Sequence, residues 1–140
     1  MPTGNHPELD DVRIRHLELI QTLVTRMDNN SFLIKGWSLT VFGAMLAYAV
    51  GGEHDSVVLV SFVPVLAFWL LDAYFHYQQR LFRRLYERVR RSDAEVEPFA
   101  LDVTPGRERT GLLKAAVSPS LSLFYGGLAL SQAATLVFVL

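Results

Sequence analysis

Two charged residues flank a hairpin of two uncharged stretches at matching positions. Lys35 lies 19 residues before His54, and Asp72 lies 18 residues after it. Because the segments between them read as two antiparallel helices joined by a short loop, we expect the two side chains at nearly equal depth. Ionised groups inside a membrane are costly, so they pair or face water. Lys35 and Asp72 are therefore predicted to form an intramembrane charge pair or to line a polar cavity.

Two roles remain open for these two residues. A salt bridge would fix the register of the two helices, with the Lys35 ammonium extended toward the lipid headgroups. Alternatively, the two charges would take part in ion conduction or gating. The structural role is the favoured interpretation, because charges within membrane helices commonly pair with one another.

Enzyme chemistry finds little support in the sequence. The four histidines are His6, His16, His54 and His76, and none has metal-ligand spacing to another His or to a carboxylate. The chain has no Cys, which excludes disulfides, thiol catalysis and Cys-based zinc sites. There is no phosphate-binding glycine loop and no nucleophile elbow. We expect no catalytic residues, no metal, no cofactor and no enzymatic activity.

Three uncharged stretches must position the charged pair. They run from Gly36 to Gly52, from Ser56 to Leu71 and from Val117 to Leu140, and the second can extend through Phe75. A bilayer core needs roughly 20 helical residues. In a chain of 140 residues, three helices that are apolar on every face would have nothing but lipid to bury them. A buried helical hairpin in a soluble bundle is the less favoured alternative.

The basic residues indicate an orientation. Residues 1–35 carry four Lys or Arg, residues 72–117 carry the other nine, and the short loop between the first two stretches carries none. The positive-inside rule makes the basic side cytoplasmic. We expect a multi-pass protein of the bacterial inner membrane with a cytoplasmic N-terminus and an external C-terminus.

Helices are also predicted outside the three spans. Apolar residues at three- and four-residue spacing predict an amphipathic N-terminal helix: Leu17, Ile20, Leu23, Val24 and Met27. Asn29-Asn30-Ser31 would break or only loosen it. The second span continues without a breaker as one helix over residues 57–91, kinked near Pro64, with a stripe of Leu81, Leu85 and Val89. The two cytoplasmic stripes are expected to pack together.

The remaining segment changes character. Residues 99–104 alternate apolar and polar side chains, which predicts a short strand. Pro105-Gly106 is a turn signal, residues 112–117 read as an interfacial helix, and Ser118-Pro119 reads as an N-cap followed by the first residue of the third span.

The expected fold is therefore an all-α membrane protein with three transmembrane helices. Its segments are a cytoplasmic amphipathic helix (1–31), the first span (32–52), an external loop (53–56), the second span (57–76), a cytoplasmic helix and loop (77–117) and the third span (118–140).

Small residues repeat every four positions on two of the spans. Gly43, Ala47 and Gly51 do so in the first, and Gly127, Ser131 and Thr135 in the third. Such stripes let helix backbones approach closely within lipid. They are predicted helix-packing positions, within one subunit or between copies. Gln132 would face a pore or hydrogen-bond to a neighbouring helix.

Arginines gather just after the second span, at positions Arg80, Arg83, Arg84, Arg88, Arg90 and Arg91. Contact with anionic lipid headgroups is the favoured interpretation, beside topology determination and a solvated helix face. Binding of an anionic ligand such as a nucleotide or oligonucleotide is the less favoured one.

Two motifs resemble those of a group of small bacterial multi-pass membrane proteins. Asn30-Ser-Phe-Leu-Ile-Lys-Gly-Trp-Ser-Leu-Thr is similar to their NSFLxKGWS-like first span. Phe68-Trp-Leu-Leu-Asp-Ala-Tyr-Phe, followed by Gln79-Arg-Leu-Phe-Arg-Arg-Leu-Tyr, is similar to their FWxLDxYY-like second span. The resemblance covers roughly residues 10–91, includes Lys35 and Asp72, and implies a membrane fold without an established activity. Small membrane effectors of antiphage systems share this general build.

The leading functional hypothesis is an oligomeric, channel-like or membrane-permeabilising effector that is controlled by its cytoplasmic helices, with antiphage defence as a candidate cellular role. Three helices cannot enclose a water-filled pore, so a channel requires several copies of the chain. The alternative is a membrane anchor or scaffold that docks a soluble cytoplasmic partner. A small transporter subunit is disfavoured, because few polar residues lie near the middle of the spans.

Overall fold

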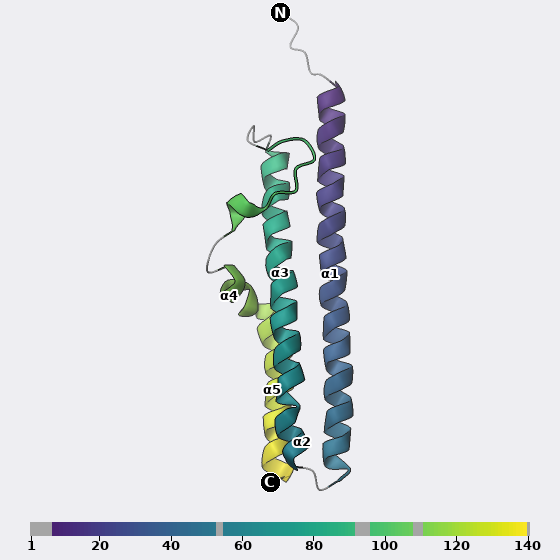
Figure 1. Cartoon of the computed structure of the whole chain (residues 1–140), viewed down its shortest axis with the longest axis vertical. Coiled ribbons are helices and arrows are strands. Elements are labelled where there is room, and N and C mark those ends of the chain that lie inside the picture. Colours follow the sequence, from purple (N-terminus) through teal and green to yellow (C-terminus); the bar gives the residue numbers. More distant parts are fainter. Residues whose placement is uncertain (1–6, 53–54, 92–95, 108–110, 140) are drawn as a thin grey trace, which may run out of the picture.

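The computed structural model describes residues 7–52, 55–91, 96–107 and 111–139 (Figure 1). The elements are α1 (Pro7–Val50), α2 (Asp55–Val60), α3 (Phe62–Arg90), the 3-10 helix η1 (Thr104–Gly106), α4 (Gly111–Ala116) and α5 (Pro119–Val139). No strand occurs within these four ranges. The expected all-α fold is therefore confirmed.

Three helical segments are long and apolar enough to cross a membrane: Asp11–Val50, Ser56–Arg90 and Pro119–Phe138. Their outer surfaces expose large apolar side chains, including Phe138 at 90%, Leu123 at 80% and Phe32 at 75%. Such a surface is compatible with a membrane location, because exposed apolar area of this kind is unfavourable in water. The start of α1 and the end of α5 lie at opposite ends of the bundle (Figure 1).

The helix α1 runs without interruption through Asn29, Asn30 and Ser31. Asparagine and serine lower helix propensity because their side chains compete for backbone hydrogen bonds. The Ser31 hydroxyl, however, donates its hydrogen bond to the Asp72 side chain of α3 and does not compete for the backbone. Packing along α3 thus keeps this segment helical, and the first two expected segments form a single helix of 44 residues.

The second span is interrupted for one residue. The helix α2 ends at Val60 and α3 begins at Phe62. Pro64 has no N–H to donate to the carbonyl four residues earlier, which is that of Val60. The amide of Ser61 still donates to the Val57 carbonyl, 2.9 Å away, and its hydroxyl donates to the Val58 carbonyl at 2.7 Å. The two helices therefore follow each other as one rod with a local irregularity just before Pro64.

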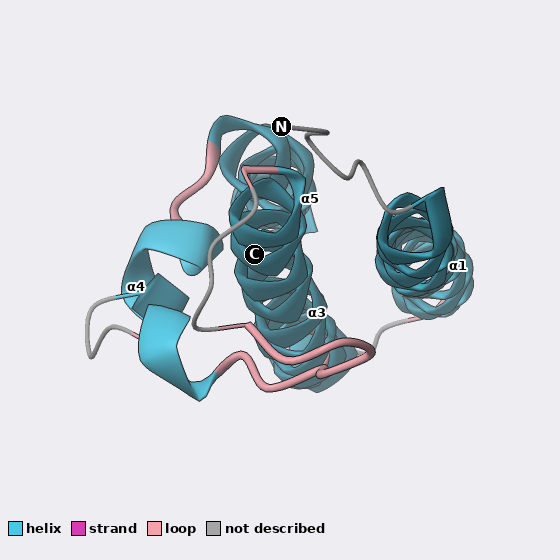
Figure 2. Cartoon of the chain, turned by 90° about the horizontal axis from the view of Figure 1, so that it is seen from above, coloured by secondary structure: helices cyan, strands magenta, loops and turns pink. Residues whose placement is uncertain are grey.

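The bundle has two parts with different composition. We call residues 36–52, 55–71 and 119–139 the apolar half, and residues 7–30, 77–91 and 96–107 the basic half. In the apolar half α5 runs alongside α2 and α3, whereas in the basic half only α1 and α3 run side by side (Figure 1). Viewed along the bundle, α1 lies on one side of α3 and α5, and α4 lies on the other (Figure 2).

Each half has its own core. In the apolar half Phe42, Val65, Leu121, Tyr125 and Leu128 belong to one buried cluster. In the basic half the buried side chains are Ile20 and Val24 of α1 with Leu85 and Val89 of α3. The two amphipathic stripes therefore pack together, as the sequence predicts.

The prediction of a strand over residues 99–104 is wrong. The amide of Ala100 donates to the Glu97 carbonyl at 3.1 Å, Phe99 has a φ of 63°, and Thr104 begins η1. An alternating pattern forms a strand only beside a partner strand, and the described residues supply none. Val96 and Val103 instead cover the apolar cluster of the basic half.

The third span begins as expected, with one difference. A short helix, α4, precedes it, and α5 starts at Pro119. The carbonyl of Ser118 accepts a hydrogen bond from the Ser122 amide at 2.9 Å, as the residue before a helix does. The Ser118 hydroxyl, however, is buried and has no hydrogen-bond partner among the described residues, so the expected side-chain cap is absent.

Candidate functional site: a buried charged network

The structure brings Lys35 and Asp72 into direct contact. The Nζ atom of Lys35 lies 2.6 Å from Oδ2 of Asp72. Lys35 also donates a hydrogen bond to the Ser31 hydroxyl, 2.8 Å away, and Ser31 donates to the Asp72 carboxylate. Ser31 and Lys35 are one helical turn apart on α1, so both face the same point of α3. The three side chains form a closed network that joins the first two long helices.

Burial explains why this network is complete. The Asp72 side chain is 0% exposed, whereas Lys35 keeps 21% of its surface accessible. Removing a carboxylate from water costs several kcal/mol, and only a close cation with further hydrogen bonds offsets that cost. The ammonium and the Ser31 hydroxyl supply both. Oδ2 of Asp72 has no hydrogen-bond partner among the described residues, so the Lys35 ammonium is the group that balances its charge.

The third span reaches the same point through Tyr125. Its ring is buried in the core of the apolar half, and its hydroxyl lies against α3 one helical turn before Asp72. The hydroxyl donates to the Phe68 carbonyl at 3.3 Å. Neither Ser31 nor Tyr125 is among the site residues that are predicted from the sequence. The usable signal for Tyr125 was a phenol within an otherwise apolar span, since buried tyrosine hydroxyls usually find a polar partner.

Gln132 is placed inside the subunit. It is 1% exposed, and its amide nitrogen donates to the Val58 carbonyl at 3.1 Å and to the Ser61 hydroxyl. These contacts lie at the irregularity between α2 and α3, where the Val58 carbonyl also accepts the Ser61 hydroxyl. The alternative in which Gln132 faces a pore is therefore wrong for this structure, and the alternative of a hydrogen bond to a neighbouring helix holds.

The small-residue stripes lie on the outside of the bundle. Gly43 and Ala47 are exposed on α1, on the side away from its buried residues, such as Ser38 and Phe42, and Gly51 is exposed just after the helix ends. On α5, Gly127 and Ser131 are exposed and Thr135 is partly exposed. A Cβ atom added to Gly43 or Gly127 would meet no atom within 4 Å. Contacts within the subunit therefore do not use the exposed glycines of either stripe.

The arginines of α3 point in several directions. Arg83, Arg84, Arg88 and Arg91 line a groove beside α3 together with Glu87. Arg90 forms an ion pair with Glu87 at 2.9 Å, and Arg91 lies 3.7 Å from the same carboxylate. Arg80 instead faces a second hollow that contains Lys35, and Arg83 borders both. The cluster read from the sequence is thus divided between two surfaces.

One histidine has a structural role that the sequence does not reveal. His16 is 3% exposed, and its Nε2 lies 2.8 Å from the carbonyl oxygen of Ala100, with its ring 5.9 Å from that of Phe99. It attaches the segment 96–107 to α1. His76 lies in the hollow with Arg80, while His6 and His54 lie outside the described residues.

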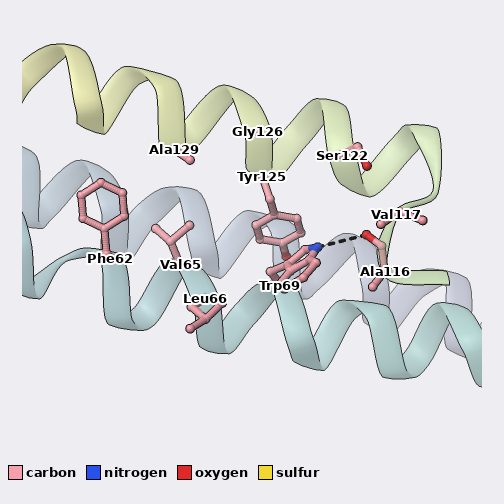
Figure 3. A pocket seen from close by; sticks show the side chains of 10 residues that line it. All are labelled: Phe62, Val65, Leu66, Trp69, Ala116, Val117, Ser122, Tyr125, Gly126 and Ala129. Atoms are coloured by element: carbon pink, nitrogen blue, oxygen red, sulfur yellow. Dashed lines mark hydrogen bonds between the residues drawn. The ribbon is translucent and has the colours of Figure 1, made fainter. Parts of the chain in front are cut away.

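An apolar groove lies between α3 and α5, with a volume of about 370 Å³ (Figure 3). Phe62, Leu66 and Gly126 are among its lining residues, and the Trp69 indole donates to the Ala116 carbonyl at 3.1 Å at one end. The groove has a shape that fits an acyl chain or a helix, but its lining has no charged group that could take part in a reaction.

The polar groups of the site can hold charge and join helices. Within the four described ranges, no group of three or more His, Asp or Glu side chains is arranged to hold a metal ion. What distinguishes the site is a buried carboxylate of α3 that binds Ser31 and Lys35 of α1, at the boundary between the two halves.

Comparisons with known proteins add no assignment: the chain matches no family model, no curated protein and no solved structure.

Proposed function

We propose that the chain is an integral protein of the bacterial inner membrane that assembles from several copies into a channel-like or membrane-permeabilising structure. The observation that carries the proposal is the outward position of both small-residue stripes. Gly43 and Gly127 are surrounded by open space, although such stripes serve close helix packing in lipid. A neighbouring copy of the chain would supply the missing helix.

The position of the stripes favours a ring. They lie on two different helices, α1 and α5, so the α1 stripe of one copy can pack against the α5 stripe of the next. Head-to-tail contacts of this kind close into rings when the rotation between copies allows it. A ring would surround the water-filled path that a single chain does not form. Ser131 and Thr40 are exposed hydroxyl residues on these helices.

The basic half would control the assembly. In this proposal it lies on the cytoplasmic side, as the positive-inside rule requires. It is joined to the apolar half by the continuous helices α1 and α3 and by the network of Ser31, Lys35 and Asp72. A ligand or partner that moves the basic half would therefore act directly on the spans. In the cell, the role proposed for this assembly is antiphage defence.

The test combines oligomeric state with conductance. The protein is purified in dodecyl maltoside, its mass is measured by light scattering with the detergent subtracted, and it is reconstituted into liposomes for a conductance assay. We expect an oligomer, ion leakage, and growth arrest when the chain is expressed. A monomeric protein that causes no ion leakage from the liposomes would overturn the proposal. It would favour the alternative of a membrane anchor that docks a soluble partner.

Matched variants connect the two readouts. Gly127→Phe places a large side chain in the α5 stripe, and Ala133→Phe places the same ring at another exposed position of α5. We expect Gly127→Phe to dissociate the oligomer and remove conductance, and Ala133→Phe to leave both intact. Asp72→Ala is then measured for assembly and conductance separately. Loss of conductance with normal assembly would assign the charged network to gating, and loss of both would assign it to structure.

A further inference from the structure

A polar hollow opens where α1, α3 and the first turn of α5 meet. Its volume is about 360 Å³, and its wall includes Ser31 and Lys35 of α1, His76, Arg80 and Arg83 of α3, and Ser120 of α5. Side chains from three helices that are far apart in the sequence thus converge on one space. Asp28 of α1 and Gln79 of α3 complete the wall.

Charge in the hollow is not balanced. Lys35 is neutralised by Asp72 at 2.6 Å, and Arg83 lies 3.7 Å from Asp28, which also accepts a hydrogen bond from Gln79. Arg80 is partly buried and has no ion-pair or hydrogen-bond partner among the described residues. A partly buried guanidinium with five unused donors leaves one excess positive charge. It matches a ligand that carries one negative charge and several acceptor oxygens.

The helix α5 adds further donors. It is 21 residues long and starts at Pro119, next to Ser120 in the wall of the hollow. The first backbone N–H groups of a helix have no partner within the helix, and the helix dipole favours an anion there. Phosphate groups are common ligands of this combination.

The position of the hollow indicates the source of the phosphate. It lies at Lys35 and Asp72, where the charge-free stretches of α1 and α3 end and the basic half begins. In a membrane this level is that of the lipid headgroups. Basic pockets between helices at this depth bind anionic headgroups. We propose that the hollow binds the phosphate of an anionic phospholipid, with Arg80 as its principal contact.

The inference rests on the proposed membrane location but not on the proposed oligomer or conductance. A monomeric protein with the hollow intact would still bind the lipid. A failure of lipid binding would in turn leave the test of oligomeric state and conductance unaffected. The two proposals can therefore fail separately.

The experiment measures lipid binding to the full chain in dodecyl maltoside. Phosphatidylglycerol and phosphatidylcholine with identical acyl chains are titrated separately, and the melting temperature is followed, because a ligand that binds the folded state raises it. We expect phosphatidylglycerol to raise the melting temperature of the wild type well above the effect of phosphatidylcholine. Arg80→Gln should weaken the apparent affinity for phosphatidylglycerol roughly tenfold, the loss of about one charge-assisted hydrogen bond.

Two further variants show whether the loss of phosphatidylglycerol affinity in Arg80→Gln is specific to the hollow. Arg91→Gln removes the same charge from the same helix outside the hollow, and it should bind phosphatidylglycerol like the wild type. Arg80→Lys keeps the charge but loses the planar fork of donors, so it should bind with an affinity between those of Arg80→Gln and the wild type.

Three outcomes would overturn the proposal. The first is equal stabilisation of the wild type by the two lipids. The second is an equal loss of affinity in Arg80→Gln and Arg91→Gln, which would show an effect of overall charge. The third is equal stabilisation by inorganic phosphate in the absence of lipid, abolished in Arg80→Gln, which would assign the hollow to a soluble phosphate.

Discussion

Lys35 and Asp72 form an ion pair whose two members differ in their access to solvent. The atoms Nζ and Oδ2 are 2.6 Å apart, yet the carboxylate side chain is 0% exposed and the lysine side chain 21% exposed. Lys35 also borders the hollow, so it has a path outward that Asp72 lacks. Removing Lys35 and removing Asp72 should therefore destabilise the protein to different extents.

The first prediction uses this asymmetry. Lys35→Met strands an ionised carboxylate without a cation, which costs about 3–5 kcal/mol of unfolding free energy. Asp72→Asn keeps an acceptor for Ser31 and leaves a lysine that can extend into the hollow, so it should cost less, about 1–3 kcal/mol. Unfolding by sodium dodecyl sulfate in mixed micelles measures both. The double variant Lys35→Met/Asp72→Leu should recover much of the loss, and equal effects of the two single variants would contradict this account.

A second prediction concerns the hydrogen bonds of Gln132. Its amide joins α5 to the Val58 carbonyl at 3.1 Å and to the Ser61 hydroxyl. Gln132→Leu keeps a similar volume but removes both bonds, so the unfolding free energy should fall by about 1 kcal/mol, the usual size of such bonds between membrane helices. Ser131→Ala, at the neighbouring exposed position, is the control and should change little. An unchanged Gln132→Leu protein would show that these bonds are not formed.

Much of the helical fold could be predicted from apolar length and periodicity. The three charge-free stretches, the stripes of Ile20 with Val24 and of Leu85 with Val89, and the start of α5 at Pro119 all follow from local pattern. The segment 99–104 could not be predicted in this way. Alternation indicates a strand only if another strand is available, and here His16 takes up the Ala100 carbonyl instead.

The site was only partly predictable for a different reason. Equal distance from the hairpin loop places Lys35 and Asp72 at one depth, but it says nothing of how α5 is rotated. Because α5 is apolar nearly all round, its pattern does not distinguish a buried Gln132 or Tyr125 from an exposed one. Tertiary packing decides that rotation, and it buries both residues.

A third prediction concerns Gly111, the first residue of α4. A Cβ atom at this position would lie 2.4 Å from Cε2 of Tyr77, a buried ring on α3. Gly111→Ala should therefore lower the unfolding free energy by about 1–3 kcal/mol through overpacking. Gly126→Ala is the matched control, since a Cβ there meets no atom within 4 Å. Adding Tyr77→Val should make Gly111→Ala tolerable, and a destabilisation that persists in the double variant would point to backbone strain rather than to the ring.

The fourth prediction concerns pH and the segment that covers the basic half. Hydrogen bonds from the side chain and the backbone of Thr104, the latter at 2.9 Å, lower the pKa of Asp102 below its ordinary value. Because the folded chain favours the ionised form, this stabilisation is present above the ordinary aspartate pKa and is lost as the pH falls through the lowered one. The carboxyl carbon shift of Asp102, followed by nuclear magnetic resonance in detergent, measures the titration. Thr104→Val removes the hydroxyl donor but keeps the amide, so the pKa should rise only part of the way. A wild-type Asp102 that titrates like an aspartate in an unstructured peptide would show that the turn before η1 is not held by this side chain.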